Sequence, residues 1–360
     1  MLEKIKVLIV DDSGLTQEIL KKILEKDLSI QVIGMAENGE KAVALAQKLK
    51  PDVITMDVNM PVMDGFKATE QIMAYCPIPI LILSSIIDKE GLYTTFNALA
   101  AGAVDVMEKP SGLENKVWNK IGDVLVQKVK TVSKVKVITH VKGKVTAILK
   151  HTESVSLPKP NKCEIIGIGA STGGPSVVMQ ILKNITSNNT LGILVIQHMA
   201  SGFINGFVDW LSDACEIKVK LAKDGDKIEK GQVLVAPDGF HAIVRNRKTI
   251  GLISGEKVND VKPSVDVLFN SVAEVYGESA VGVLLTGMGA DGAKGLKHIK
   301  DKGGITIAQS EKSCAVFGMP KAAIEKGAVD KVLSVEDIIR TLKGIINSNN
   351  NNNDQQANCS

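Results

Sequence analysis

The sequence predicts a protein of two α/β domains, each with a parallel sheet covered by helices on both faces. Short apolar runs alternate with amphipathic stretches over residues 1–126 and again over residues 163–346. Between them lies a lysine-rich stretch, residues 127–162, which we interpret as a linker. Aromatic residues make up only 3% of the 360 residues although 44% are hydrophobic, so the cores should be aliphatic α/β layers.

Composition and charge exclude several classes of protein. The net charge of +3 predicts no strong preference for nucleic acid. No apolar run approaches the length of a membrane span, and the N-terminal residues do not resemble a signal peptide. The five cysteines are scattered without a Cys-x-x-Cys pair, which is typical of reduced thiols. We therefore expect a cytoplasmic protein with no nucleic-acid partner and no direct insertion into a membrane.

Strands and helices are expected to alternate strictly in the first domain. Strands are expected at residues 7–10, 31–34, 53–56, 80–83 and 105–107. Helices are expected near residues 15–25, 41–49, 66–73, 93–101 and 113–126. Such alternation predicts a parallel sheet whose ligands bind beyond the carboxyl ends of the strands.

Polar side chains fall at those strand ends. Asp11 and Asp12 follow the first strand, and Asp57 ends the third. Carboxylates crowded at one edge repel one another, and their hard oxygen ligands suit Mg²⁺. A metal there would neutralise an incoming phosphoryl group while Asp57 attacks it, and Ser84 and Lys109, after the fourth and fifth strands, would contact its oxygens. The competing interpretation is that the Asp11-Asp12 pair only caps a helix and that Asp57 is a loop residue.

These residues lie in motifs that resemble a response-regulator receiver domain. The motifs are Val-Asp-Asp-Ser at residues 10–13, Met-Asp-Val-Asn-Met-Pro-Val-Met-Asp-Gly at 56–65 and Glu-Lys-Pro at 108–110. The resemblance implies a flavodoxin-like fold, a Mg²⁺ cofactor for phosphorylation, and phosphorylation of Asp57 by a partner histidine kinase. Val106 departs from the pattern, since many receivers carry Tyr or Phe at that position.

The linker, residues 127–162, carries nine lysines and a single acid, Glu153. A basic run of this kind is usually a solvated tether. The alternative is docking onto an acidic partner or an anionic lipid. Apolar and polar residues alternate over residues 135–141, which allows a short strand there.

Alternation returns in the second domain. Strands are expected near residues 165–168, 192–196, 281–285 and 305–308, and a closing helix near 335–346. Residues 217–253 are expected to form several short strands, as a β-rich insertion in a doubly wound sheet. The asparagine-rich tail, residues 347–360, is too polar to bury and is expected to be disordered.

Residues 165–175 predict a strand, a tight turn and a helix that begins near Pro175. Ser171 lies in that turn within a Gly-x-Ser-x-Gly pattern, which would expose its hydroxyl above the sheet. Two other interpretations compete. Ser171 or Thr172 could be the N-cap of the helix. The glycines could also form a dinucleotide loop of a nicotinamide enzyme, but Thr172 occupies the place of the third glycine.

Residues that follow the carboxyl ends of parallel strands are the candidate partners of Ser171. His198 and Asp291 each follow an expected strand, so a hydroxyl nucleophile, a base and an orienting carboxylate are all available. His241 is the only serious rival to His198 among the five histidines. The glycines around Asp291 let backbone approach backbone, so the N–H of Met288 and one from the Ser171 turn, at Thr172, could hold an oxyanion.

The same residues lie in motifs that resemble the chemotaxis protein-glutamate methylesterases of the CheB type. These are Gly-Ile-Gly-Ala-Ser-Thr-Gly-Gly-Pro (167–175), Gln-His-Met (197–199), Lys-Pro-Ser-Val-Asp-Val-Leu-Phe (262–269), Leu-Thr-Gly-Met-Gly-Ala-Asp-Gly (285–292) and Cys-Ala-Val-Phe-Gly-Met-Pro (314–320). Some relatives carry a basic, histidine-containing run where this chain has Asn-Asp-Val-Lys at residues 259–262.

This resemblance implies a Rossmann-like esterase domain with Ser171 as nucleophile, His198 as general base and Asp291 as its orienter. It implies hydrolysis of glutamyl methyl esters on chemoreceptors in bacterial chemotaxis adaptation, with release of methanol and no cofactor for the esterase. Deamidation of receptor glutamines and control by phosphorylation of the receiver are implied as well. The alternative function is a response regulator with a non-catalytic output domain, for example one that binds nucleic acid, but no basic recognition helix is visible.

Overall fold

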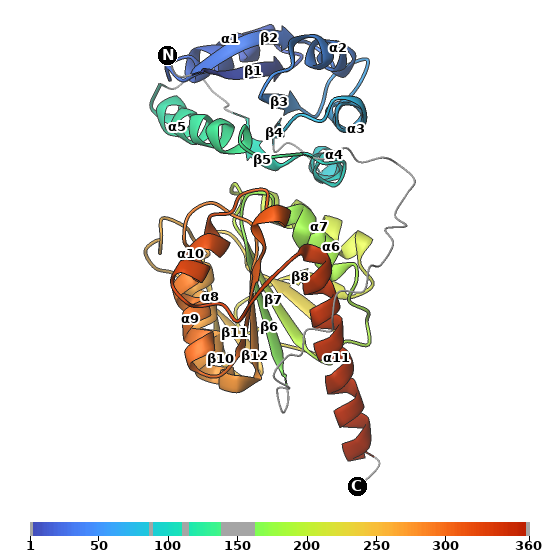
Figure 1. The fold of residues 1–360 in the computed structure, drawn as a ribbon, viewed down its shortest axis with the longest axis vertical. Coiled ribbons are helices and arrows are strands. Elements are labelled where there is room, and N and C mark those ends of the chain that lie inside the picture. The colour runs from blue at the N-terminus through green and yellow to red at the C-terminus, as the bar shows by residue number, and fades with distance from the viewer. Residues whose placement is uncertain (1–2, 86–88, 110–114, 138–162, 358–360) are drawn as a thin grey trace. The chain divides into compact units, whose positions relative to one another are not determined.

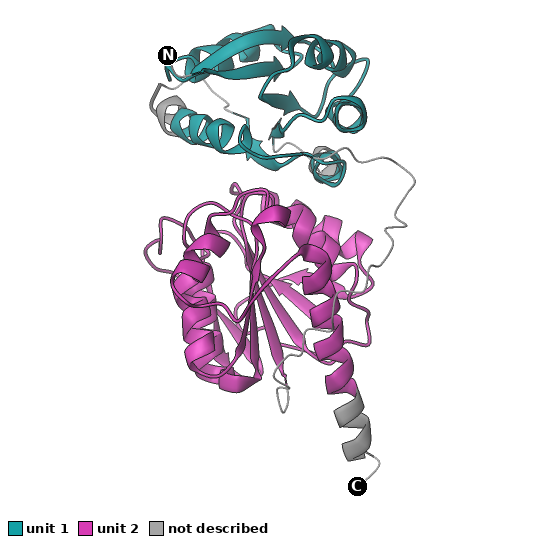
Figure 2. Cartoon of the chain, in the orientation of Figure 1, with its two compact units in different colours: residues 1–158 teal, residues 159–360 magenta. Residues whose placement is uncertain are grey.

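The computed structural model describes residues 3–85, 89–109, 115–137 and 163–357. The chain divides into two compact units, residues 1–158 and residues 159–360 (Figure 2). Among the described residues, no helix combines the length and the apolar content needed to cross a membrane.

The first unit contains a five-stranded parallel sheet with the strand order β2-β1-β3-β4-β5 (Figure 1). Its strands are β1 (Ile5–Val10), β2 (Ile30–Ala36), β3 (Val53–Asp57), β4 (Ile80–Ser84) and β5 (Asp105–Glu108). Its helices are α1 (Gly14–Leu24), α2 (Gly39–Leu49), α3 (Gly65–Tyr75), α4 (Lys89–Ala100) and α5 (Asn115–Val132). Helix α1 packs with α5, and α2, α3 and α4 pack in succession. The predicted parallel α/β fold is confirmed, with helices on both faces of the sheet.

Helix α5 continues past residue 126, where the sequence predicted its end. Val129 and Val132 are fully buried, which extends the apolar face of the helix into the unit. Lys128 pairs with Asp105, and Lys130 pairs with Asp27. The first residues of the predicted linker are therefore part of a packed helix rather than a solvated tether. Residues 135–137 are not in a strand, and the rest of the predicted linker strand lies outside the described residues.

The second unit contains a seven-stranded parallel sheet with the order β14-β13-β12-β6-β7-β9-β8. Its strands are β6 (Ile165–Ala170), β7 (Gly192–Gln197), β8 (Lys218–Leu221), β9 (Gln232–Val235), β12 (Ala280–Leu284), β13 (Ile305–Gln309) and β14 (Lys331–Leu333). Strands β10 (His241–Asn246) and β11 (Thr249–Ile253) form a separate antiparallel hairpin. The predicted β-rich insertion is thus only partly separate, because β8 and β9 extend the main sheet.

Helices cover both faces of this sheet (Figure 1). They are α6 (Gly174–Leu182), α7 (Phe203–Ala214), α8 (Val265–Tyr276), α9 (Ala293–Asp301), α10 (Met319–Glu325) and α11 (Val335–Ala357), with short 3₁₀ turns at Gly277–Ser279 and Glu311–Ser313. Helix α6 packs with α7 and α11, whereas α9 packs with α8 and α10. The core between α8 and the sheet is mainly aliphatic and includes the fully buried Phe269.

The asparagine-rich tail is not disordered where it begins, contrary to the prediction. Helix α11 continues through it to Ala357. The Asn349 amide donates to the Thr190 hydroxyl at 3.2 Å, and that hydroxyl donates to Asn350 Oδ1 at 2.6 Å. Asn350 also donates to the carbonyl oxygen of Asn188. Asn349 and Asn350 therefore hydrogen-bond to the loop before β7, so the composition of the tail alone was a poor guide to order.

Candidate phosphorylation site and candidate active site

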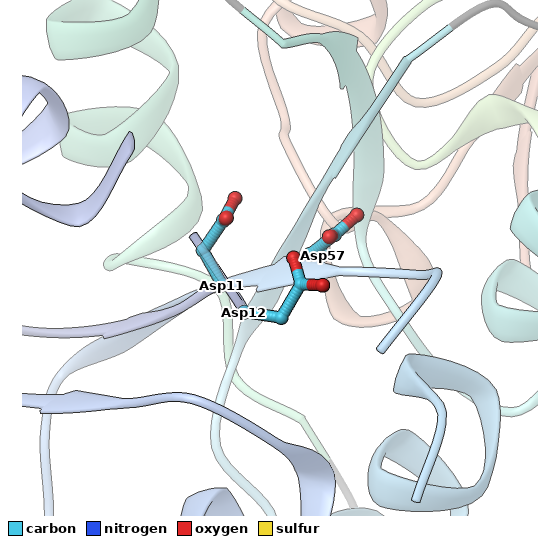
Figure 3. Close-up of side chains that lie close together, drawn as sticks. All are labelled: Asp11, Asp12 and Asp57. Carbon is cyan, nitrogen blue, oxygen red and sulfur yellow. The ribbon is translucent and has the colours of Figure 1, made fainter. Parts of the chain in front are cut away.

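Three aspartates gather at the carboxyl edge of the first sheet (Figure 3). Asp11 and Asp12 follow β1, and Asp57 ends β3, the neighbouring strand. The chain lays β2 on one side of β1 and β3 on the other, which makes this edge a topological switch point, the usual place for ligands in such sheets. One carboxylate oxygen from each aspartate lies within 4.8 Å of the others. The residues predicted to hold a metal are thus brought together.

Lys109 links two of these carboxylates. Its Nζ lies 2.8 Å from Asp11 Oδ2 and 2.6 Å from Asp57 Oδ2. Burial would lower the pKa of Lys109, but its hydrogen bonds to Asp11 and Asp57 raise the pKa above its ordinary value. Burial raises the pKa of Asp57, and the contact with Lys109 offsets this only in part. Three carboxylates and one ammonium group leave a net charge of about −2, so these residues fit a divalent cation with oxygen preference such as Mg²⁺.

Ser84 reaches the same edge from β4 and is buried. Its carbonyl oxygen accepts the Lys109 N–H at 2.9 Å, and its hydroxyl accepts a hydrogen bond from Thr95 at 3.0 Å. The alternative that the aspartate pair only caps a helix is wrong, because the N-cap of α1 is Ser13. All five strand-end residues predicted for a phosphorylation site therefore lie on neighbouring strands of one sheet edge.

The second cluster lies at the carboxyl edge of β12, β6 and β7, three adjacent strands. Ala170 at the end of β6 is paired in register with Gln197 at the end of β7, so Ser171 and His198 follow the ends of two neighbouring strands at the same level. Adjacent strands are about 4.8 Å apart. The chain places β7, β8 and β9 on one side of β6 and then crosses to β12 on the other. This edge is also a topological switch point.

The turn at Ser171 is not a simple helix cap. The N-cap of α6 is Gly173, which has a positive φ of 77° and makes no side-chain cap bond, and Pro175 lies in the first turn. Neither Ser171 nor Thr172 is the N-cap, so that interpretation is wrong. The carbonyl oxygen of Ser171 accepts the Gly174 N–H at 2.8 Å, which closes the turn.

The loop after β12 approaches Ser171 closely. The Ser171 N–H donates to the carbonyl oxygen of Thr286 at 3.0 Å. A Cβ atom at Gly287 would lie 2.7 Å from Ser171 Cβ and 2.3 Å from Met319 Sδ, so only glycine fits there. Met288, the next residue, is 52% exposed. The sequence prediction that glycines let this backbone approach the Ser171 turn is confirmed.

Asp291 lies beside His198 and is surrounded by donors. His198 Nε2 lies 3.1 Å from Asp291 Oδ2. Asp291 accepts hydrogen bonds from the Ser264 hydroxyl (2.7 Å), the Asn259 amide (2.7 Å) and the Val265 N–H (2.6 Å) at the start of α8. Burial alone would raise the pKa of Asp291, but His198, Ser264 and Asn259 together lower it below its ordinary value. This carboxylate is therefore held ionised.

His241, the rival histidine, is occupied by structural bonds. Its Nδ1 accepts the Ser264 N–H at 3.1 Å, so its Nε2 carries the proton and donates to the carbonyl oxygen of Glu256 at 2.9 Å. The ring is buried, and both nitrogens are committed to backbone. His241 therefore orders the segment before α8, and His198 is the histidine beside an aspartate at the strand edge.

Comparisons with known proteins find two families that match this chain. Residues 166–342 match the family model for CheB methylesterase, and residues 7–117 match the model for the response regulator receiver domain. The protein-glutamate methylesterase/protein-glutamine glutaminase 1 of Syntrophus aciditrophicus is 47% identical over 342 residues, which cover 94% of this chain and 97% of that protein. The chain belongs to the CheB methylesterase family.

A second relative matches nearly the whole chain, and a solved structure matches half of it. The protein-glutamate methylesterase/protein-glutamine glutaminase of Sulfurimonas denitrificans is 44% identical over 344 residues, covering 93% of this chain and 96% of that protein. A crystal structure of the CheB methylesterase catalytic domain of Thermotoga maritima is 40% identical, with a TM-score of 0.49, and covers 50% of this chain and 97% of that one. Both the predicted flavodoxin-like receiver domain and the predicted doubly wound CheB catalytic domain are confirmed.

Sequence reasoning missed two residues of this CheB chain that touch the candidate active site. Gln197 is buried, and its Nε2 donates to the carbonyl oxygens of both Ser171 (2.8 Å) and His198 (2.9 Å). It therefore fixes the two backbone segments relative to each other. The signal was its place as the last residue of a strand directly before His198. Asn259 was noted only as part of a departure from relatives, although it contacts Asp291.

Proposed function

We propose that this chain is a phosphorylation-regulated hydrolase of chemotaxis adaptation. Its substrates would be glutamyl methyl esters of methyl-accepting chemoreceptors, which it would hydrolyse to glutamate and methanol, and it would also deamidate receptor glutamines. The names of its relatives, protein-glutamate methylesterase/protein-glutamine glutaminase, support both activities. The observation that carries the proposal is the His198–Asp291 contact at 3.1 Å, on the strand edge level with Ser171.

Ser171 is the proposed nucleophile. Its Oγ attacks the ester carbonyl carbon while His198 takes the hydroxyl proton, which His198 then gives to the departing methoxide to form methanol. Water attacks the resulting acyl-serine with His198 again as base, releasing glutamate and restoring Ser171. With a glutamine substrate, ammonia leaves in place of methanol. Because Nε2 of His198 faces Asp291, we assign the proton transfers to Nδ1.

Asp291 would stabilise the imidazolium ion that forms on His198 during each transfer. Its lowered pKa supports this role, because an ionised carboxylate is needed throughout the cycle. We propose that backbone N–H groups of Thr172 and Met288 hold the oxyanion. The N–H of Ser171 itself is committed to Thr286, so the donor from this turn must come from a later residue. The backbone at Gly287 lies so close to Ser171 that an added Cβ atom would be 2.7 Å from Ser171 Cβ. This close approach supports the choice of Met288, the next residue.

Asp57 is the proposed phosphorylation site, with a chemotaxis histidine kinase as donor. Asp11, Asp12 and Asp57 would hold Mg²⁺, which would neutralise charge on the phosphoryl group. Lys109 Nζ, 2.6 Å from Asp57, would pair with a phosphoryl oxygen, and the hydroxyl of Ser84 would donate to another. The raised pKa of Asp57 supports this role, because it indicates that the protein alone does not fully stabilise the negative charge of the carboxylate.

Methanol release from methylated chemoreceptor membranes tests the catalytic half of the proposal. Wild type and Ser212→Ala should release methanol at the same rate, because Ser212 is an exposed serine on α7 of the same unit. Ser171→Ala should be slower by at least about 10³-fold, since the nucleophile is lost. Absence of release from wild type, or full release by Ser171→Ala, would refute the proposal.

A further inference from the structure

A two-residue turn precedes helix α8 and faces the candidate active site. Val258 and Val261 exchange both backbone hydrogen bonds, at 3.2 and 3.1 Å, so Asn259 and Asp260 occupy the two central positions. Their φ angles are 52° and 63°. Two consecutive positive φ values in a two-residue hairpin are the mark of a type I′ turn, which favours Asn, Asp and Gly. The backbone here therefore restricts which residue can stand at position 259.

The side chain of Asn259 makes two hydrogen bonds that the turn itself does not require. Its Nδ2 donates to Asp291 Oδ1 at 2.7 Å and to Asp266 Oδ2 at 2.8 Å. An amide nitrogen has two hydrogens, so both are used. Both carboxylates are only 3% exposed. Asn259 thus connects two buried anions, one of which lies beside His198.

The two oxygens of Asp291 have different surroundings. Oδ1 accepts from Asn259, from the Ser264 hydroxyl and, at 3.3 Å, from the Asp266 N–H. Oδ2 accepts from the Val265 N–H and lies 3.1 Å from His198 Nε2. Donors concentrated on Oδ1 leave Oδ2 directed at the histidine. The orientation of the carboxylate therefore depends on the groups that hold Oδ1.

Asp266 adds a second negative charge to this region. Its Oδ1 accepts the Gly295 N–H at 2.7 Å in the first turn of α9, the helix that follows Asp291. Without a donor between them, the carboxylates of Asp266 and Asp291 would repel each other in a buried setting where charge is poorly screened. The Asn259 amide is the donor that lies between them.

We propose that Asn259 is a positioning residue for hydrolysis, whose amide holds Asp291 with Oδ2 toward His198 and separates it from Asp266. This inference rests on the proposed function, because it concerns the same Ser171–His198–Asp291 site. A role limited to the turn makes a different prediction. Any residue suited to a type I′ turn would then serve at position 259.

Two substitutions keep the turn and change the donor. Asn259→Gly keeps positive φ available and removes the amide. Asn259→Asp keeps the shape of the side chain but replaces the donor by a carboxylate oxygen beside two others. Asp260→Asn is the matched control, because Asp260 occupies the other central position of the turn and is exposed. The experiment uses the full chain with Mg²⁺ and a small phosphodonor, and measures kcat and KM for methanol release from methylated receptor membranes.

The kcat of Asn259→Gly should fall about tenfold and that of Asn259→Asp about 100-fold, the range expected for loss of a hydrogen bond to a charged group. The KM of Asn259→Gly should stay within about twofold of wild type, because Asn259 acts through Asp291 rather than on the substrate. Asp260→Asn should match wild type, and Asn259→Gly should unfold at the wild-type temperature to within a few degrees.

Wild-type kcat in Asn259→Gly would overturn the inference while leaving the proposed function intact, provided Ser171→Ala is inactive in the same assay. An equal fall in Asp260→Asn would also overturn it, since the turn rather than the amide would then be responsible. No methanol from wild type would overturn the proposed function and this inference together. The arms of the experiment therefore separate the two failures.

Discussion

Asp57 and Asp291 are both buried aspartates at a switch point of a parallel sheet, yet their pKa values are displaced in opposite directions. Asp57 accepts a hydrogen bond from the Val58 N–H at 2.7 Å, and Lys109 Nζ lies 2.6 Å from its carboxylate. Lys109 also contacts Asp11, so Asp57 shares this lysine with a second carboxylate. Its pKa is raised by burial. Asp291 is just as buried, but several donors lower its pKa. Burial raises the pKa at both sites; what differs is that more donors surround Asp291, while Asp11 repels Asp57.

This difference matches the chemistry proposed for each site. A carboxylate that must accept a phosphoryl group gains from a setting that the protein leaves incompletely neutralised, because a cation can then bind beside it. A carboxylate that must stay ionised to stabilise an imidazolium ion gains from donors supplied by the protein itself. An aspartate at the edge of a parallel sheet can thus serve either proposed role, and the neighbouring groups determine which.

The largest expected effect comes from removing the negative charge of Asp291. Asp291→Asn should lower methanol release by about 10³- to 10⁴-fold, because the amide cannot stabilise the His198 imidazolium. Phosphate uptake from a small phosphodonor at Asp57 should be unchanged. Asp301→Asn, which alters an exposed aspartate of α9, is the control and should release methanol at the wild-type rate. Equal release by Asp291→Asn and Asp301→Asn would break the comparison.

A smaller effect is expected from disturbing the packing of the active-site loop. Gly287→Ala places a methyl group 2.7 Å from Ser171 Cβ and 2.3 Å from Met319 Sδ, so the loop must shift. Methanol release should fall about 100-fold, since displacements of an ångström cost that much in catalysis. Gly289→Ala serves as the control. Its φ of 86° makes alanine unfavourable, but no atom lies within 4 Å of the new methyl group.

If Gly287→Ala and Gly289→Ala lose the same activity, general strain in the loop explains the effect. The close approach of Gly287 to Ser171 would then have no special part in catalysis. Phosphate uptake by the receiver domain should be unaffected in both variants.

The smallest expected effect is on the pH dependence of folding stability, which should have opposite signs at Asp291 and Asp57. The folded pKa of Asp291 lies below its ordinary value of 3.8, so the stability it contributes is present above about pH 4 and is lost as pH falls through the folded pKa. The folded pKa of Asp57 lies above 3.8, so its contribution is present below about pH 4 and is lost as pH rises through the folded pKa.

Hydrogen exchange of each unit, measured without Mg²⁺ in wild type, Asp291→Asn and Asp57→Asn, tests these signs. The stability advantage of wild type over Asp291→Asn should shrink below about pH 4. The stability of Asp57→Asn relative to wild type should rise as pH increases above about pH 4. Parallel pH trends at the two positions would show that donor number does not distinguish them.

The sequence predicted well whatever depends on local periodicity. Alternating strands and helices predicted both sheets. The strand ends also predicted that Asp57 lies at one sheet edge and Ser171, His198 and Asp291 at another, because residues after parallel strands meet at one edge. Close approach of the loop after β12 followed from its glycines. These features are encoded within a few residues of where they act.

What the sequence could not predict depends on contacts between distant segments. The choice between His198 and His241 required the Ser264 and Glu256 bonds that occupy both nitrogens of His241. The donors on Asp291 come from the segment before α8, which no spacing rule connects to Asp291. The ordered start of the asparagine-rich tail likewise depends on the loop at Thr190, far away in the chain.

We propose that phosphorylation of Asp57 controls hydrolysis at Ser171. The most direct test measures methanol release from methylated receptor membranes by full-length wild type and Asp57→Asn, each with and without a small phosphodonor and Mg²⁺. The phosphodonor should raise release by wild type and leave Asp57→Asn at its basal rate, while both release methanol without it. Release that does not respond in wild type, or that rises equally in Asp57→Asn, would contradict the claim.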